Sequence, residues 1–526
     1  MHPVETLELV IALLLATLAL HWIAARLRFP PAAALLVGGG TLAFVPGLPT
    51  IELDPELVLV LFLPPLLMDG AYFTAVASFR RHLAEILSLA VGAVVFTTLA
   101  VGLVVHWLVP LLPWAACFAL GAIVSPPDAV SARAVLKRVS LPRRLSTIIE
   151  GESLLNDASG LVLVRFAVAA TLTGTFSVTD ATMSFGVLAI GGLAVGGAIG
   201  ALWLFIHRHL HDETLMIAAS VILCWAAYLA GEALHVSGVI ATVAAGLVYG
   251  WYQHVIFTAS VRIRGSSFWH VMVFLFEAMV FILIGFSLRG VMLRVGGIET
   301  VFATMAGPVV GALVAMTAAR FAWVFGSDAI LTLLGQLHLT NRQPLGAGAA
   351  TVLGWAGMRG VVTLAIALTL PETMPGRDLM LVTAFAAILV TVLVQGSTFG
   401  LLIRATRLVD RDPPPRLSLA AAEAQVAQAQ LVQVSALARS DDGELLHPRL
   451  LETYERRARQ TGDYSADESA FTGAISAHFD IVIAAVAAGR AELVRLHRAD
   501  DIGDETLHDL EHDLDLEELA AISAKA

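Results

Sequence analysis

Residues 150–157 read Glu-Gly-Glu-Ser-Leu-Leu-Asn-Asp, inside an apolar run that is long enough to cross a bilayer. Three carboxylates and one carboxamide are therefore crowded where water is scarce. An ionised carboxylate in hydrocarbon costs several kcal/mol, and such groups are retained mainly where they bind ions or relay protons. The motif thus indicates a functional site within a membrane-spanning helix.

Helical spacing brings the polar side chains of this motif together. At 100° per residue, an arc of about 140° holds four of them, those of Glu152, Asn156, Ser153 and Asp157. Gly160 lies under the middle of the arc and leaves room there for another backbone or for an ion. A compact acidic face of this kind is typical of a cation site and not of a packing surface.

The composition indicates an all-α membrane protein. The chain has 526 residues, of which 57% are hydrophobic and 14% charged, and its mean hydropathy is +0.80. Soluble domains usually carry about 25% charged residues. The first apolar run lacks a basic leading region and a small-residue cleavage site, so we interpret it as a retained span. Cys117 and Cys224 lie in apolar segments, which indicates no disulfide framework.

The apolar runs predict about thirteen transmembrane helices, each long enough for ~30 Å of hydrocarbon. They lie at residues 6–26, 30–49, 56–74, 84–108, 114–136, 147–170, 184–206, 214–230, 236–252, 268–288, 301–325, 349–370 and 379–403. The positive-inside rule then places the N-terminus outside and the C-terminus in the cytoplasm. In this orientation fifteen lysines and arginines are cytoplasmic, and only three face outward, Arg289, Arg294 and Arg377. An Ala- and Arg-rich composition favours a GC-rich bacterium and hence its inner membrane.

The composition changes after the last apolar run, which divides the chain into a transmembrane domain over 1–408 and a cytosolic helical tail over 409–526. Pro413-Pro414-Pro415 marks a stiff break, and helical periodicity follows in 418–439, 444–460, 467–498 and 504–522. From Asp410 onward there are 23 acidic and 11 basic residues, against 43 and 32 in the whole chain. We predict that this acidic tail is regulatory. Residues 508–518 are typical of a solvated amphipathic helix, with a regulatory docking helix as the alternative.

A second intramembrane acid, Asp128, follows the consecutive prolines Pro126 and Pro127. Two prolines in the middle of a span remove backbone donors and break the helix. Broken helices at membrane depth are tolerated where they line a cavity, and their ends then hold ions. Asp128 lies where the helix is expected to restart, and the positive end of the helix dipole favours its charged form there. The alternative is a simple proline kink with a solvated acid.

Residues 354–362 form the matching feature in the second half of the chain. Three glycines loosen this predicted helix, and Arg359 puts a fixed charge at membrane depth. The distance from the first break suggests an inverted repeat with two interrupted helices that cross at the midplane. An unpaired arginine there is expensive, so Arg359 and Arg320 should have acidic partners, for which Glu152 and Glu150 are the candidates. We interpret Glu152, Arg320 and Arg359 as a structural ion-pair group.

Other polar residues are more ambiguous. Asp69 follows Pro64 and Pro65 in a segment that we expect to be proline-broken, where it either shapes the cation pathway or ends its helix. For Glu277, structural hydrogen bonding is favoured over transport. The histidines at positions 207, 209 and 211 suggest a cytoplasmic interfacial cluster more than a metal site.

Taken together, these motifs resemble the monovalent cation:proton antiporter-1 family, the NhaP-type and NHE-type sodium/proton exchangers. The matching pieces are Leu63–Asp69, Ser125–Val130, Glu150–Asp157, Arg320 and Gly357–Val362. The resemblance implies thirteen helices, two inverted repeats, and a homodimer in which a mobile core moves against a dimerisation domain. It implies that Asp157 is the cation/proton carboxylate and that Na⁺ is bound by Asp157, Asp128, Ser153 and Asn156 with backbone carbonyls. It also implies that Glu152 pairs with Arg320, with Arg359 close by.

One position departs from the family. The family often has Thr-Asp-Pro where this chain has Pro127-Asp128-Ala129, so one hydroxyl ligand is absent and water or a carbonyl must replace it. In this family, Asn before the key Asp is typical of electroneutral members. The resemblance therefore suggests the exchange of one sodium for one proton.

The expected mechanism needs no cofactor. Burial favours the protonated form of a carboxyl group, so a buried acid can hold a proton or a cation in turn, and this competition couples the two fluxes. We expect Na⁺ or Li⁺ to exchange for H⁺, with a K⁺/H⁺ or broad monovalent cation/H⁺ antiporter as the alternative.

The expected partners are these ions, the lipid bilayer, a second copy of the chain and a regulator of the tail, and no nucleic acid. A channel or membrane sensor is less favoured because no filter pattern is visible, and an enzyme because no nucleophile–His pair, intramembrane zinc motif or phosphate loop occurs.

Overall fold

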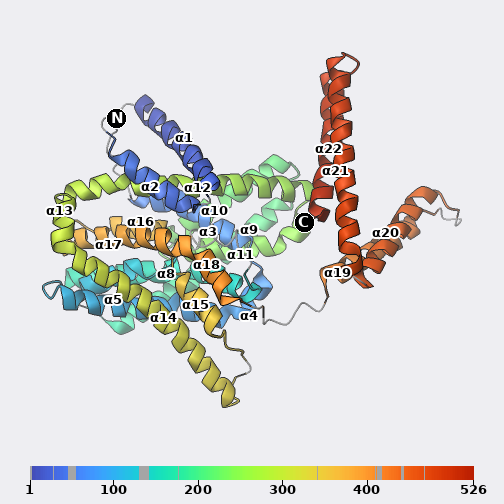
Figure 1. Ribbon diagram of the computed structural model, residues 1–526. Helices are drawn as coiled ribbons and strands as arrows, with labels where there is room; N and C mark the ends of the chain where they lie inside the picture. Colours follow the sequence, from blue (N-terminus) through green and yellow to red (C-terminus); the bar gives the residue numbers. More distant parts are fainter. Residues whose placement is uncertain are drawn as a thin grey trace. The chain divides into compact units, whose positions relative to one another are not determined.

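Helices make up most of the protein, as the computed structural model shows (Figure 1). The structure describes residues 3–27, 29–45, 55–128, 141–175, 177–340, 342–408, 410, 417–439, 444–466 and 468–525. Within these ranges there is no strand, only one isolated bridge between Arg439 and Leu445, so the all-α prediction is confirmed. The chain divides into two compact units, Met1–Arg411 and Asp412–Ala526. The expected helix restart after Asp128 and the break at Pro413–Pro415 lie outside the described residues.

The first unit begins with helices that correspond to the predicted spans up to residue 173. They are α1 (Pro3–Leu27), α2 (Pro31–Ala43), α3 (Pro55–Tyr72), α4 (Val76–Leu87), η1 (Ser88–Ala93), α5 (Val94–Leu108), α6 (Trp114–Val124) and α8 (Arg143–Thr173). The short π-helical segment η1 connects α4 and α5 without a break, so these three form one long helix.

The remaining helices of this unit follow the same pattern. They are α9 (Val178–His207), α10 (Glu213–Ala233), α11 (Gly238–Ile256), α12 (Ala259–Val295), α13 (Ile298–Thr300), η2 (Val301–Met305), α14 (Ala306–Gln336), α15 (Ala347–Trp355), α16 (Val361–Leu368), α17 (Arg377–Val390), η3 (Thr391–Gln395) and α18 (Gly396–Thr406). Among the described residues, eight helices are long and apolar enough to cross a membrane, and four shorter apolar helices accompany them. The protein is therefore a multi-pass membrane protein, while the count of thirteen spans and the inverted repeats stay predictions.

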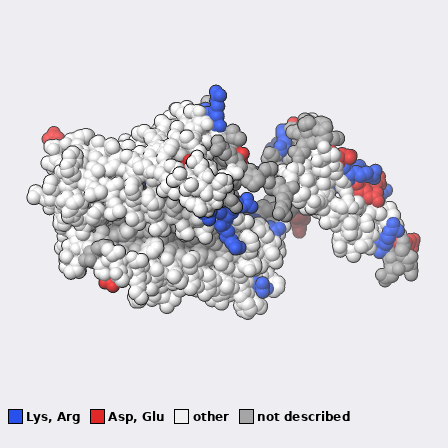
Figure 2. All heavy atoms as spheres, turned by 90° about the horizontal axis from the view of Figure 1, so that it is seen from below, with Lys and Arg blue, Asp and Glu red and all other residues white. Residues whose placement is uncertain are grey.

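The surface of this unit agrees with a bilayer environment. On the face seen in Figure 2, the membrane unit shows few charged side chains, and most of its surface is uncharged. Large apolar side chains such as Leu111, Ile190 and Phe302 are exposed on it. In water such a surface would be unfavourable, but it is compatible with lipid tails.

The helices of the membrane unit pack in two groups, which Figure 1 shows on opposite sides of the unit. In one group α2 packs on α12, and α9, α10 and α3 pack on α11. In the other group α5 packs on α6 and α14, α6 on α8, and α14 on α15. Contacts of α3 with α16 and α8, and of α12 with α16 and α17, join the two groups. The candidate site lies along this join.

The prediction that Pro64 and Pro65 break their helix is wrong. Both lie inside α3, which continues to Tyr72, so Asp69 neither follows a break nor ends the helix. Proline at 64 removes the donor that would have bonded to the carbonyl of Val60. The indole Nε1 of Trp225 donates to that carbonyl instead, at 3.0 Å. A neighbouring helix thus satisfies the freed carbonyl, which is how membrane helices tolerate proline.

At the first of the two other motifs the predicted helix end is present, and at the second the whole predicted interruption is present. The helix α6 ends at Val124, directly before the prolines at 126 and 127. In the second half of the chain, α15 ends at Trp355 and α16 begins at Val361, with residues 356–360 between them in non-helical conformation. Each interruption leaves backbone carbonyls at the end of a half-helix without intrahelical donors.

The second unit is helical, as its periodicity predicts. Its helices are α19 (Leu419–Leu437), α20 (Pro448–Ala466), α21 (Glu468–Arg498) and α22 (Asp504–Lys525), and α19 packs on α20 while α21 packs on α22. Arg490 on α21 holds the second pair through ion pairs of 2.6 Å to both Asp515 and Glu518. Leu510 and Leu516 on α22 are 45% and 50% exposed, which agrees with a solvated amphipathic helix.

Candidate functional site

The segment that follows α6 meets the break between α15 and α16. The backbone N–H of Asp128 donates to the carbonyl of Met358 at 2.7 Å, which joins the segment after α6 to the segment between α15 and α16. Gly360 permits this close approach, because a Cβ at that position would lie 1.9 Å from Oδ2 of Asp128. The two motifs that the sequence places about 230 residues apart, at Asp128 and Met358, thus form one crossing.

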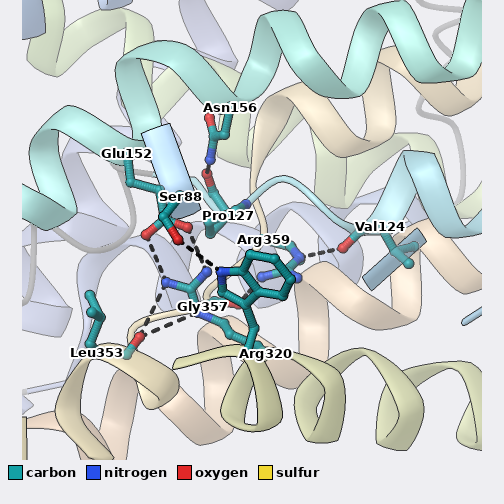
Figure 3. Close-up of polar contacts among 10 residues, drawn as sticks. Ser88, Val124, Pro127, Glu152, Asn156, Arg320, Leu353, Gly357 and Arg359 are labelled. Atoms are coloured by element: carbon teal, nitrogen blue, oxygen red, sulfur yellow. Dashed lines mark hydrogen bonds and ion pairs between the residues drawn. The ribbon is translucent and has the colours of Figure 1, made fainter. Parts of the chain in front are cut away.

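Arginines bind the carbonyls that the breaks set free (Figure 3). Arg359 donates from Nε to the carbonyl of Val124, the last residue of α6, at 2.5 Å. Arg320 donates to the carbonyl of Leu353 near the end of α15, from Nε at 3.3 Å and from Nη2 at 3.2 Å. A cation at a helix C-terminus is stabilising because it meets the negative end of the helix dipole. Each half-helix therefore ends on a guanidinium group.

Glu152 and Arg320 form a buried bidentate pair (Figure 3). The Nη1–Oε1 and Nη2–Oε2 distances are 2.6 and 2.9 Å, and the two side chains are 2% and 5% exposed. This fork-to-fork geometry is the strongest kind of side-chain hydrogen bonding. It leaves the charge of Arg320 balanced by Glu152 within the crossing.

The expected acidic partner of Arg359 is not present among the described residues. Arg359 is 1% exposed, and its guanidinium donates to the carbonyls of Val124 and Gly357. Its backbone N–H donates to the hydroxyl of Thr391 at 2.9 Å. The ion-pair assignment is thus wrong for Arg359, because unwound backbone supplies acceptors that a sequence-based search for carboxylates does not consider.

The polar arc of α8 is divided into two faces. On one face, Asn156 is fully buried and donates from Nδ2 to the carbonyl of Pro127 at 2.6 Å (Figure 3). Its Oδ1 atom has no hydrogen-bond partner in the described part of the chain. Gly160, expected to leave room for a backbone or an ion, receives the ring of Pro126, whose Cγ lies 2.3 Å from where a Cβ would be. Glu152 and Asn156 therefore point into the helix crossing.

The other face of α8 lines a cavity of about 580 Å³ between the two helix groups. Its lining includes five carboxylates and three other polar residues, Asp69, Asp128, Glu150, Asp157, Glu277, Ser153, His21 and His270. No lysine or arginine is among the described residues that line it. The cavity therefore presents oxygen atoms and negative charge, which suit a small hard cation.

Asp157 is one of two buried acids among the described residues that line this cavity, and the other is Asp69 on α3. Its side chain is 6% exposed, and no described residue forms a hydrogen bond or an ion pair with its carboxylate. The predicted residues Asp128, Ser153 and Asp69 line the same cavity, whereas Asn156 does not. Four of the five predicted site residues therefore line the same cavity.

The cavity also contains residues to which the sequence analysis gave no transport role. The sequence predicts Glu150 only as a partner for an arginine, and for Glu277 it favours structural hydrogen bonding. His270, Phe274 and Glu277 recur at positions i, i+4 and i+7 on α12, and all three line the cavity. The two polar members, His270 and Glu277, lie seven residues apart on one face of an apolar helix, and this spacing is the signal that the sequence offers.

The histidine group at the end of α9 is not an interfacial cluster as a whole. His207 is 1% exposed, and its two ring nitrogens lie 2.9 and 3.1 Å from the carbonyls of Trp203 and Met216. The hydroxyl of Tyr249 lies 2.9 Å from Nε2 of the same ring. His207 is therefore a packed structural residue. No group of three or more His, Cys, Asp or Glu side chains suited to a metal ion occurs in the described ranges.

We expect Gly360→Ala to reduce transport by on the order of 10- to 100-fold, because the new methyl group must displace the carboxylate of Asp128. The initial rate of cation-driven proton movement in proteoliposomes measures this loss. Gly197→Ala is the matched control, because a Cβ there meets nothing within 4 Å. Equal rates for both variants would contradict the close packing at the crossing.

Comparisons with known proteins agree with this architecture. A family model described as "Sodium/hydrogen exchanger, transmembrane" matches residues 10–405. The chain is 31% identical over 509 residues to YjcE of Escherichia coli (strain K12), an uncharacterised Na(+)/H(+) exchanger, and the match covers 90% of each chain. It is 34% identical over 417 residues to a sodium, potassium, lithium and rubidium/H(+) antiporter of Bacillus pumilus, covering 75% of this chain and 61% of that relative.

A solved structure shares the fold. The sodium proton antiporter MjNhaP1 from Methanocaldococcus jannaschii matches with a TM-score of 0.62 at 20% identity. The match covers 76% of this chain and 98% of that one.

Proposed function

The chain belongs to the transmembrane sodium/hydrogen exchanger family, and on that premise we propose that it exchanges Na⁺, or Li⁺, for H⁺ by competition at Asp157. The family match confirms the resemblance drawn from the motifs and identifies a transporter, not an enzyme. The finer points, which are the ligands, the stoichiometry and the cycle, are our proposal. Exchange is taken to be electroneutral, with one cation for one proton.

The environment of Asp157 is the observation that supports this proposal. A carboxylate that is 6% exposed normally has a charged or hydrogen-bonding partner, and Asp157 has none among the described residues. The nearby guanidinium groups are engaged, Arg320 by Glu152 and Arg359 by backbone carbonyls. Asp157 is thus available to hold either a proton or a cation. Because one charge cannot satisfy both, the two ions exclude each other.

The surrounding oxygens suit a monovalent hard cation as the transported substrate. Asp128 and Ser153 line the cavity with Asp157, and Asp69 contributes a carboxylate from α3. Asn156 has one carboxamide oxygen without a partner in the described chain, although its amide group is committed to Pro127. We assign the cation to the cavity residues Asp157, Asp128 and Ser153, with Asp69 along the path to them. Asn156, expected from the sequence as a further ligand, lies outside the cavity lining and supports the site through the carbonyl of Pro127. Water or a carbonyl replaces the hydroxyl that Pro127 lacks.

The position of the cavity between two helix groups suggests how access alternates. Its lining includes Pro31 at the start of α2 and Phe73 after the end of α3, both beside loops that the positive-inside rule assigns to the cytoplasm. We therefore take this state as inward-facing. A movement of one helix group against the other would close the cavity and open Asp157 to the outer side. A homodimer in a bacterial inner membrane, with a regulatory cytosolic tail, completes the proposal.

A broader cation preference is the second candidate. The relative from Bacillus pumilus is named for sodium, potassium, lithium and rubidium, and it is 34% identical to this chain. Pro127 also has no hydroxyl group, so the site lacks a side-chain ligand that would select cations by size. A site with fewer fixed side-chain ligands discriminates less between cations by size.

Proteoliposomes with an internal pH-sensitive dye test the proposal. We expect Na⁺ and Li⁺ to drive proton movement, and the initial rate to stay unchanged when valinomycin and potassium clamp the membrane potential at zero or at a negative value. Equal rates with K⁺ as the driving ion would favour the broad antiporter. A rate that follows the membrane potential would contradict one-for-one exchange, and cation flux without proton movement would indicate a channel.

A further inference from the structure

Glu150 lies on the same face of α8 as Asp157. Seven residues separate the two, which corresponds to about 20° around the helix and about 10 Å along its axis. Both side chains line the cavity, and so does Ser153 between them. Glu150 is partly exposed, whereas Asp157 is 6% exposed. Glu150 is therefore the carboxylate of this helix that an ion from the water meets first.

Half of the Glu150 carboxylate is uncommitted. The hydroxyl of Ser146 donates to its Oε1 at 3.0 Å, and no described residue bonds to its Oε2. The neighbouring arginine on α8, Arg144, is bound to Glu85 and to the carbonyl of Gln343. Glu150 thus contributes an unneutralised negative charge to a cavity whose described lining contains no lysine or arginine.

We propose that Glu150 sets the apparent affinity for the transported cation on the cavity side, by raising the local cation concentration next to Asp157. This inference rests on the proposed function and adds a residue to it. Clefts with charge of one sign and low-dielectric walls concentrate counter-ions. Glu150 acts through its charge at a distance, so it alters cation capture and not the translocation step. It is neither a ligand at Asp157 nor a carrier of the exchanged proton.

Coulomb's law sets the size of the effect. A unit charge about 10 Å from the bound cation changes its affinity by about 2-fold in water and by about 15-fold at an effective dielectric constant of 20. Ions in the cavity mouth screen this interaction, because the Debye length is about 10 Å at 0.1 M ionic strength. The contribution of Glu150 should therefore shrink as ionic strength rises.

The test compares Glu150→Gln with wild type in proteoliposomes, with the cation added on the cavity side. At low ionic strength we expect the KM for Na⁺ to rise about 2- to 15-fold with an unchanged maximal rate. Choline chloride, which supplies ionic strength without a transported cation, should bring the two KM values together. Glu150→Asp keeps the charge and should keep a KM close to that of wild type.

Two matched controls separate charge from structure. Ser146→Ala removes the hydrogen bond to Glu150 but leaves its charge, and Glu232→Gln removes a half-buried carboxylate that pairs with Arg165 and is not among the residues that line the cavity. Both should leave the KM unchanged. An unchanged KM in Glu150→Gln, or an equal loss in Glu150→Asp, would overturn the inference. A wild type without cation-driven proton movement would instead overturn the proposed function itself.

Discussion

Replacing Glu152 by glutamine should lower the free energy of unfolding by about 3–5 kcal/mol, the usual effect of removing one partner from a buried ion pair. The variant leaves the guanidinium of Arg320 buried without a counter-charge, and its remaining acceptors, the carbonyl of Leu353 and the amide oxygen of the new glutamine, are neutral. Because Arg320 also holds the end of α15, the crossing should loosen together with the pair. Chemical or thermal unfolding of the purified protein in detergent measures the change.

A double-mutant cycle provides the control for this prediction. Glu152→Gln combined with Arg320→Gln removes both charges, so it should be less destabilising than the sum of the single variants. Glu85→Gln breaks a partly buried pair with Arg144 at the start of α8, and a smaller loss is expected there. If the free energy of unfolding of Glu152→Gln lies within about 0.5 kcal/mol of the wild-type value, the pair does not hold the crossing together.

Asp157→Asn should abolish cation-driven proton movement without loss of stability. Asparagine has the same shape but neither binds a proton in exchange for a cation nor carries a charge. The carboxylate of Asp157 has no partner among the described residues, so the substitution removes a buried charge and leaves no other group unsatisfied. Its unfolding free energy should therefore equal or exceed that of wild type.

The contrast between the two acids is the informative result. Glu152 and Asp157 lie five residues apart on α8, and the structure gives one a bidentate partner and the other none among the described residues. We expect loss of stability from the first substitution and loss of exchange from the second. Proteoliposome transport and unfolding in detergent, measured on the same preparations, separate the two effects. Residual exchange in Asp157→Asn would contradict the role of this carboxylate.

Much of the fold follows from the sequence because helices in lipid must satisfy their own backbone. Apolar runs of sufficient length therefore had to be helical, and the breaks at Pro126-Pro127 and Gly354–Gly360 were visible as residues that do not continue a helix. The same local rule failed at Pro64 and Pro65. There the indole of Trp225 satisfies the freed carbonyl from another helix, which no local pattern reveals.

The sequence predicts which residues belong to the site. It does not predict which of them face the cavity and which face the helix crossing. An angular projection of α8 placed Glu152, Asn156, Ser153 and Asp157 on one arc, but it cannot show what packs against that arc. The ring of Pro126 rests on Gly160 at the middle of the arc, so Glu152 and Asn156 turn toward the crossing while Asp157 faces the cavity. Likewise, the acceptors of Arg359 are carbonyls that exist only because the backbone is unwound.

Proton release on cation binding tests the competition at Asp157 most directly. Sodium chloride is added to the purified protein in weakly buffered detergent solution with a pH indicator, and choline chloride serves as the control. The account predicts that each bound sodium releases up to one proton over the pH range in which the site is protonated, and that Asp157→Asn releases none. Sodium binding without proton release in wild type, or undiminished release in Asp157→Asn, would contradict it.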